Sequence, residues 1–245
     1  MPAMNRPRAS TESFQTTCWT RVCAARADSE EGRQALSELC AAYYAPVLAF
    51  LRCELREVDA AREAAHAFFA QMLGGGGMDK AQRDRGRFRA YLLGAVRHFL
   101  SHEREAAQRL KRGGAALELL PLDPEATAIR TLADTRGRTP DAAFDRQWAL
   151  TTVTRAFEAV RQQSHAEGRG AFFEQVKPWL TGDATHGSQA ALAAEHGLSP
   201  AALKMAVQRL KNRFREAVRA EISGTLDDDN RVTEEMRSLF AALEG

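Results

Sequence analysis

The sequence predicts an all-α protein built of two small helical domains, a flexible linker and a C-terminal helix. Helix-forming residues such as Ala, Leu, Arg, Glu and Gln are abundant, whereas β-branched residues are sparse and no segment alternates between apolar and polar positions. The 245 residues suffice for one large or two small domains, and 44% of them are hydrophobic. Disorder over the whole chain and collagen-like structure are therefore excluded.

Three helices are expected in the first half of the chain. The first covers about 29–50 and is apolar on one face, although Pro46 should bend this helix or divide it in two. The second covers about 58–73 and ends at the four glycines of 74–77, because glycine loses much conformational freedom in a helix. The third covers about 87–112, with regularly spaced apolar residues that predict an inward face.

Shorter helices are expected after a break in periodicity. Residues 113–140 include three prolines and lack a regular apolar pattern, so they predict an interdomain linker. Asp141 is the expected N-cap of a helix that runs to about Gln163. Further helices are expected at about 170–180, 188–196 and 200–222, with a final amphipathic helix from about 232 to 243.

The net charge of +2 conceals an uneven distribution. Residues 83–112 hold nine basic and three acidic side chains, and residues 204–219 hold six basic and one acidic. Residues 227–245 hold six acidic and two basic side chains. Two basic segments far apart in the sequence predict two separate contacts with a polyanion, the alternative for each being an ordinary solvated helix face.

The most specific local pattern is a helix-turn-helix at 189–210. Ala193 is small enough for a helix crossing, Gly197 suits a turn with positive φ, and Ser199 and Pro200 fit the cap and first position of the second helix. The apolar residues expected to lock the pair together are Leu192, Leu198, Leu203 and Val207. The face that could enter a major groove consists of Lys204, Met205, Gln208, Arg209, Lys211 and Asn212, with Arg213 and Arg215 placed for phosphates. An ordinary helical hairpin with a basic outer face is the alternative.

Basic and aromatic residues are interleaved near the start of the 87–112 helix. Basic groups can follow a phosphate backbone, and aromatic rings can stack on unpaired bases. The alternative for Phe88, Tyr91 and Phe99 is burial in the core.

Neither membrane segments nor a disulfide framework are expected. No apolar run approaches the roughly 20 residues of a spanning helix, and the first ten residues lack the apolar stretch of a signal peptide, so a cytoplasmic protein is expected. The four cysteines lie in the first quarter of the chain at spacings typical of neither a zinc knuckle nor a redox pair, and buried thiols are the simplest interpretation.

Several stretches follow one another in the order of a known family. Residues 14–22 (FQTTCWTRV), then 64–73 (AAHAFFAQML), 85–93 (RGRFRAYLL) and 97–104 (RHFLSHER), precede the helix-turn-helix. Together they resemble sigma factors of the sigma-70 class, specifically the minimal two-domain extracytoplasmic-function (ECF) type. Within that type, the chain resembles the subgroup linked to Ser/Thr kinases. The resemblance covers about 14–222.

The resemblance implies a non-enzymatic subunit, without metal or other cofactor, that binds core RNA polymerase at the β′ clamp and β flap and directs it to promoter DNA. The implied segments are a sigma2-like domain at 14–112, a linker at 113–140, a sigma4-like domain at 141–223 and an acidic extension at 224–245. The implied clamp contacts are Asp59, Arg62, Glu63, His66 and Phe69. The implied minus-ten contacts are Arg85, Arg87, Arg89, Tyr91, Arg97, His98, His102 and Arg104. The implied minus-thirty-five contacts are Lys204, Met205, Gln208, Arg209, Lys211, Asn212 and Arg213.

The chain departs from the family pattern at two places. An acidic patch usual on the clamp-binding helix is reduced to Asp59 and Glu63 with Arg62 between them, which should weaken docking to a basic clamp surface. His98 and His102 stand where asparagine is common. A Ser/Thr kinase and an anti-sigma factor both stay open as regulatory partners.

Two other functional classes were weighed against a sigma factor. A helix-turn-helix regulator that binds duplex DNA without joining polymerase would tolerate the weakened clamp patch. A metal-dependent hydrolase would use His98 and His102, which stand four residues apart, but the sequence supplies no third ligand at a clear spacing.

The acidic C-terminal extension carries a hypothesis of its own. It can fold back on a basic DNA-binding face or cover an apolar groove between the domains. The alternative is a helix that completes the core.

Overall fold

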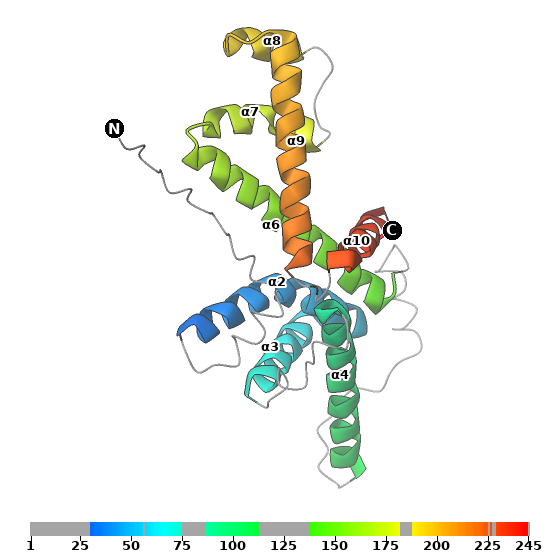
Figure 1. Cartoon of the computed structure of the whole chain (residues 1–245). Helices are drawn as coiled ribbons and strands as arrows, with labels where there is room; N and C mark the ends of the chain where they lie inside the picture. Colours follow the sequence, from blue (N-terminus) through cyan, green and yellow to red (C-terminus); the bar gives the residue numbers. More distant parts are fainter. Residues whose placement is uncertain are drawn as a thin grey trace, which may run out of the picture.

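The computed structural model describes residues 30–55, 57–74, 87–112, 138–181, 188–224, 226 and 229–244. These residues form helices and no strand, so the expected all-α class is confirmed (Figure 1). The helices are α2 (Glu30–Glu54), α3 (Val58–Gly74), α4 (Phe88–Arg112), α6 (Pro140–Ala166), α7 (Gly170–Thr181), α8 (Ser188–Glu195), α9 (Pro200–Ser223), the short 3₁₀ helix η3 (Asp229–Arg231) and α10 (Val232–Glu244).

Two local expectations need adjustment. Helix α2 continues through Pro46 as one element, with the neighbouring Tyr43 and Val47 buried in the core. The expected N-cap of α6 at Asp141 is wrong: Thr139 is the cap, its Oγ1 accepting a hydrogen bond from the Ala142 N–H at 3.2 Å. Pro140 then occupies the first helical turn, where its missing N–H costs nothing.

The larger hydrophobic core joins helices from both sides of the predicted linker. Its fully buried members include Leu51 of α2, Phe88 of α4, Phe144 of α6 and Ile222 of α9. Helix α10 contributes Leu239 to the same cluster. The expectation that the 87–112 helix turns apolar residues inward is confirmed for Phe88 and Phe99, which are 1% and 8% exposed.

The smaller core binds the helix-turn-helix to its supporting helices. It contains Val160 of α6, Phe173 and Val176 of α7, Leu192 of α8 and Leu203 of α9. Helices α6 and α9 lie side by side and each contributes to both cores, as the run of α6 from the region of α2 up to α7 makes visible (Figure 1). These two helices therefore connect the N-terminal helices to the helix-turn-helix.

The linker prediction falls mainly outside the described residues, which omit 113–137. The division of the chain into two domains stays a prediction, while the described helices on either side of 113–137 share the larger core. None of the described helices is both long and apolar enough to cross a membrane.

The shared core can be tested through α6. Phe144→Ala removes a ring that is 0% exposed and should lower the free energy of unfolding by about 3–5 kcal/mol. Thermal unfolding followed by circular dichroism measures the change. Leu150→Ala, at a position of α6 that is 39% exposed, is the matched control and should shift stability by less than about 0.5 kcal/mol. Equal, small effects of both substitutions would show that α6 does not pack on the N-terminal helices in solution.

Candidate nucleic-acid interface

The turn between α8 and α9 has the geometry that the sequence predicts. Gly197 has a φ of 61°, and the Leu198 N–H donates to the Ala193 carbonyl at 2.8 Å, which closes the end of α8. Ser199 caps α9, its Oγ accepting from the Ala202 N–H at 3.1 Å. The expected locking residues are confirmed, since Leu192, Ala193, Leu203 and Val207 are buried and Leu198 packs against them.

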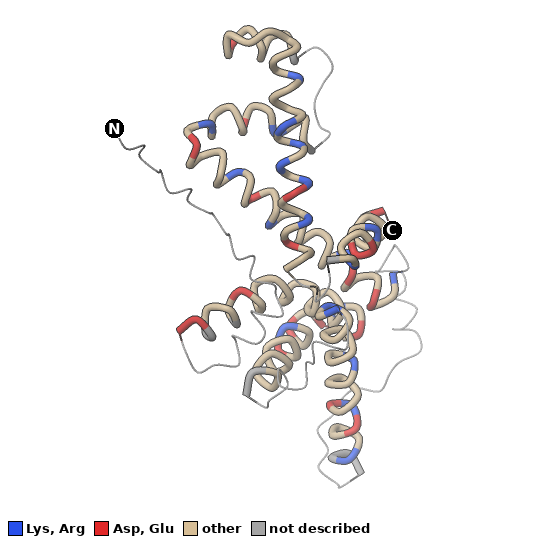
Figure 2. Tube along the Cα trace, in the orientation of Figure 1, with Lys and Arg blue, Asp and Glu red and all other residues tan. Residues whose placement is uncertain are grey.

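The opposite face of α9 is open to solvent. Met205 is 58% exposed, so its side chain is available at the surface of this face. Gln208 Nε2 donates to Asn212 Oδ1 at 3.1 Å, which aligns two amides along the helix surface. Lys and Arg residues recur along α9 (Figure 2). The other exposed members of the predicted face are Lys204, Arg209 and Lys211, and Arg213 is half-buried.

Arginines from two segments also surround a small open pocket between α9 and the start of α7. Arg209 and Arg213 come from α9, and Arg169 comes from the α6–α7 turn. Glu167 accepts from Arg213 at 2.9 Å and also pairs with Arg169. Three guanidinium groups beside one carboxylate leave an excess of positive charge, as a phosphate contact requires.

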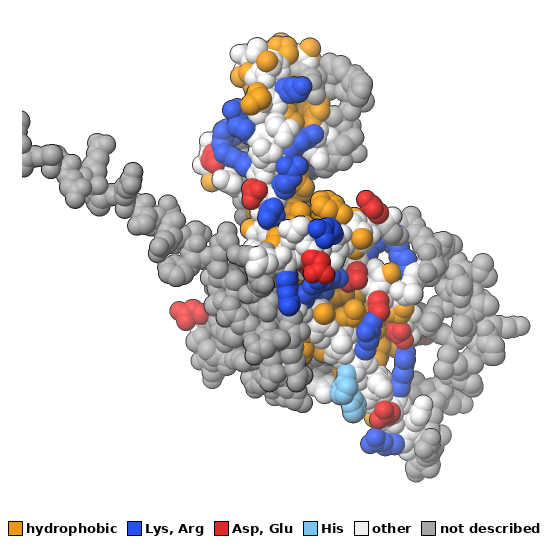
Figure 3. Space-filling view, turned by 45° about the vertical axis from the view of Figure 1, so that its right-hand side comes forward, with side chains coloured by type: hydrophobic (Ala, Val, Ile, Leu, Met, Phe, Trp, Pro, Cys, Tyr) orange, Lys and Arg blue, Asp and Glu red, His pale blue; other side chains and the backbone are white. Residues whose placement is uncertain are grey.

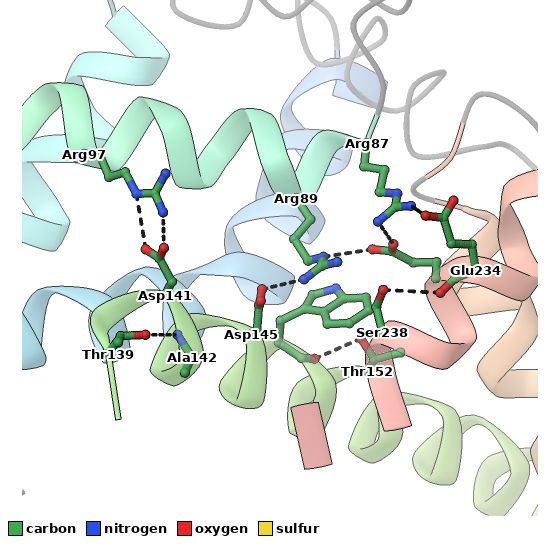
Figure 4. A network of polar contacts seen from close by, with 12 residues as sticks. Arg87, Arg89, Arg97, Thr139, Asp141, Ala142, Asp145, Thr152, Glu234 and Ser238 are labelled. Atoms are coloured by element: carbon green, nitrogen blue, oxygen red, sulfur yellow. Dashed lines mark hydrogen bonds and ion pairs between the residues drawn. The ribbon is translucent and has the colours of Figure 1, made fainter. Parts of the chain in front are cut away.

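The arginines of α4 lie in a different setting. Arg97 pairs with Asp141, and Arg89 pairs with Asp145, both carboxylates lying on α6 (Figure 4). The Arg89 guanidinium also lies 4.3 Å from the centre of the Trp148 ring, within the range of a cation–π contact. These contacts join the face of α4 to the N-terminal half of α6.

Helix α10 supplies further carboxylates to Arg89 and to Arg87, the residue directly before α4. Arg87 lies 2.7 Å from Glu234 and 3.0 Å from Glu235, and Arg89 donates to Glu235 at 2.8 Å (Figure 4). Glu235 is 1% exposed; its Oε1 accepts the Arg89 bond, whereas its Oε2 faces Arg87 without hydrogen-bond alignment. Helix α10 belongs to the larger core, so the alternative of a helix that completes the core is confirmed. Its carboxylates also pair with Arg87 and Arg89, while the role of these arginines in DNA binding stays a prediction.

These ion pairs shift the pKa values of one carboxyl group and one guanidinium group. The hydrogen bond from Arg87, with its positive charge, lowers the pKa of Glu234 below its usual range. Burial alone would lower the pKa of Arg89, but the bonds to Glu235 and Asp145 outweigh it, so the net shift is upward. Both shifts favour the charged forms of Glu234 and Arg89.

The other residues predicted to contact the minus-ten element differ in exposure and in their partners. His98 and His102 are exposed, and their Nε2 atoms lie 3.1 Å apart. Tyr91 packs partly against the larger core, and Arg104 donates to Glu54. Arg85 lies outside the described residues. Within the described part of the chain, no three His, Cys, Asp or Glu side chains gather as a metal site.

The predicted clamp-binding residues lie on α3. Glu63 is exposed, and Asp59 and Arg62 form an exposed ion pair at 3.2 Å, so part of the little negative charge is already neutralised. His66 is exposed at the helix surface, its Nε2 lying 3.0 Å from the Tyr44 hydroxyl oxygen. Phe69 is 7% exposed and belongs to the core, so we withdraw it from the contact face.

Sequence reasoning missed the partners that complete these interfaces. Asp141 and Asp145 are the α6 carboxylates that pair with Arg97 and Arg89 of α4. The two members of each pair are 44 and 56 residues apart, so no local pattern in the sequence links them. Arg169 sits in a turn and carries no pattern of its own. One signal in the sequence did point to such a partner: the acidic first turn of the final helix, whose negative charge could pair with a basic face.

Comparison with known proteins adds no assignment: no family model matches the chain, and no curated protein or solved structure is significantly similar to it.

The positive φ at the α8–α9 turn gives a direct stability test. Gly197→Ala should cost about 1 kcal/mol, because an L residue is strained at this φ although no atom lies within 4 Å of the new Cβ. Gly94→Ala is the matched control: it also meets nothing within 4 Å, but in the middle of α4 it should stabilise by about 0.5–1 kcal/mol. Chemical denaturation of both variants measures the difference, and effects of the same sign would contradict the turn geometry.

Proposed function

We propose that this protein is an ECF-type sigma factor, which binds core RNA polymerase and directs transcription initiation at specific promoters. Its partners are promoter DNA and the β′ clamp and β flap of the polymerase, and its place of action is the cytoplasm. The protein performs no chemical step of its own in this role. Its regulatory partner is a Ser/Thr kinase or an anti-sigma factor.

The proposal rests on the exposed face of α9, which follows the α8–α9 turn of the helix-turn-helix. Gln208 and Arg209 offer the donors and acceptors that read base edges in a major groove, and Lys211 offers a charge for phosphate. Arg169 and Arg213, which share Glu167 as a partner, add net positive charge beside this surface. The family resemblance over 14–222 adds polymerase binding, which the α9 face alone would not suggest.

A DNA-binding regulator that acts without polymerase is the second candidate. The exposed Asp59–Arg62 pair favours it, because a neutralised acidic patch attracts a basic clamp surface only weakly. Both candidates use the α9 face in the same way, so polymerase binding separates them.

Base-reading and phosphate-binding residues on α9 should respond differently to substitution. With a duplex selected from a randomised pool, Gln208→Ala should cost about 1–3 kcal/mol and relax the preference at one base position. Lys211→Ala should weaken binding to all sequences and reduce the salt-dependence slope by about 1. Fluorescence anisotropy at several salt concentrations measures both. Arg52→Ala, an exposed arginine on α2, is the control and should change neither quantity.

Polymerase binding is tested with core enzyme from the same organism. The full chain should co-purify with core polymerase in stoichiometric amounts and support initiation at the selected duplex in vitro. Arg62→Glu frees Asp59 and adds negative charge to α3, so it should raise polymerase affinity several-fold through a stronger attraction to the basic clamp. Arg52→Glu is the control of equal charge change. Absence of co-purification for all three proteins, with duplex binding intact, would favour the free-standing regulator.

A further inference from the structure

We propose that α10 competes with single-stranded nucleic acid for the N-terminal end of α4. The inference rests on the proposed function, because it takes Arg87, Arg89 and Arg97 as contacts for the phosphates of an unpaired strand. In the structure, all three guanidinium groups are bound to carboxylates from α6 or α10. Arg87 and Arg89 are therefore occupied while α10 is docked, whereas Arg97 is held by Asp141 of α6.

Carboxylate and phosphate compete for the same donors. A guanidinium presents its N–H groups in a fixed planar fork that suits either oxyanion, but a donor engaged by one is lost to the other. Arg87 is committed to Glu234 and Glu235, and Arg89 to Glu235 and Asp145. Their side chains are 23% and 12% exposed, so a strand cannot reach these groups without displacing α10.

A buried glutamate at position 235 favours docking of α10 that another anion can reverse. Glu235 is 1% exposed, beside Val232 and Leu239 of the same helix, where an apolar side chain would pack without a desolvation cost. A carboxylate at such a position instead makes docking of α10 depend on the two arginines. Neutralising those arginines with another anion removes the partner that Glu235 needs and releases the helix.

The two nucleic-acid interfaces therefore differ in availability. The face of α9 that carries Lys204 and Gln208 is exposed, and α10 contributes no carboxylate to it among the described contacts. The space-filling view shows basic side chains on the surface of the helix-turn-helix region, while acidic and basic side chains alternate over the region below it (Figure 3). Duplex binding at α9 should proceed with α10 docked, and strand binding at α4 should not.

The test measures strand binding directly and needs no polymerase. A fluorescent 25-nucleotide single-stranded DNA is titrated with the full chain and with Glu234→Arg, in which α10 repels Arg87 instead of attracting it. Glu234 is 60% exposed, so this variant keeps the core intact, as thermal melting will verify. Glu244→Arg makes the same change in net charge on an exposed residue of α10 and is the matched control. Glu235→Gln, which keeps the shape and removes the buried charge, is the second variant.

Glu234→Arg should bind the strand about fivefold more tightly than Glu244→Arg, and Glu235→Gln should bind more tightly than wild type. Addition of the strand to wild type should also speed hydrogen exchange in 232–244, whereas a duplex that binds α9 should not. Equal affinities of the two arginine variants, an unchanged exchange rate with strand bound, or no strand binding by any variant would each overturn the proposal. Transcription with core polymerase is scored separately, so a failed sigma function and a failed competition are distinguishable.

Discussion

The pairing of Glu235 with Arg87 and Arg89 is the interaction on which the arrangement of the terminal helix depends. A carboxylate that is 1% exposed is costly to bury unless opposite charges accompany it. Arg87, which directly precedes α4, and Arg89 of α4 meet that requirement, and Asp145 of α6 balances Arg89. One buried charge thereby ties α4, α6 and α10 together, three helices that are distant in sequence.

The sequence predicts the helices well because their signals are local. Gly197, Ser199 and Pro200 fix the turn and start of α9 through their own backbone preferences, and the structure reproduces each of them. The N-cap of α6 was misassigned because Thr139 and Asp141 are both good capping residues. The structure uses Thr139, which leaves Pro140 in the first helical turn, and Asp141 pairs with Arg97 instead.

Pairing between distant segments could not be predicted in the same way. Arg89 and Glu235 are 146 residues apart, and nothing in either local pattern specifies the other. Charge totals indicated that the acidic extension could meet a basic face, but they did not choose between α4 and α9. In the structure, apolar side chains beside the carboxylates, such as Leu239, pack on the larger core together with the ion pairs to Arg87 and Arg89. Phe69 was misplaced for a related reason, because a helix pattern alone does not say how much of its apolar face is covered.

The membership of α6 in both cores has a consequence for the behaviour of the free protein. Under the proposed function the chain contacts promoter elements at minus ten and minus thirty-five, and this nominal separation of about 25 base pairs is about 85 Å along B-DNA. A compact chain of this length has a radius of gyration of only about 18 Å. Occupying both elements therefore requires α6 to part from α2, which uncovers Phe144, Trp148 and Ala149. In an extended molecule this apolar stripe would face water and favour self-association, so the proposed function also requires that another surface covers the stripe when α6 and α2 separate.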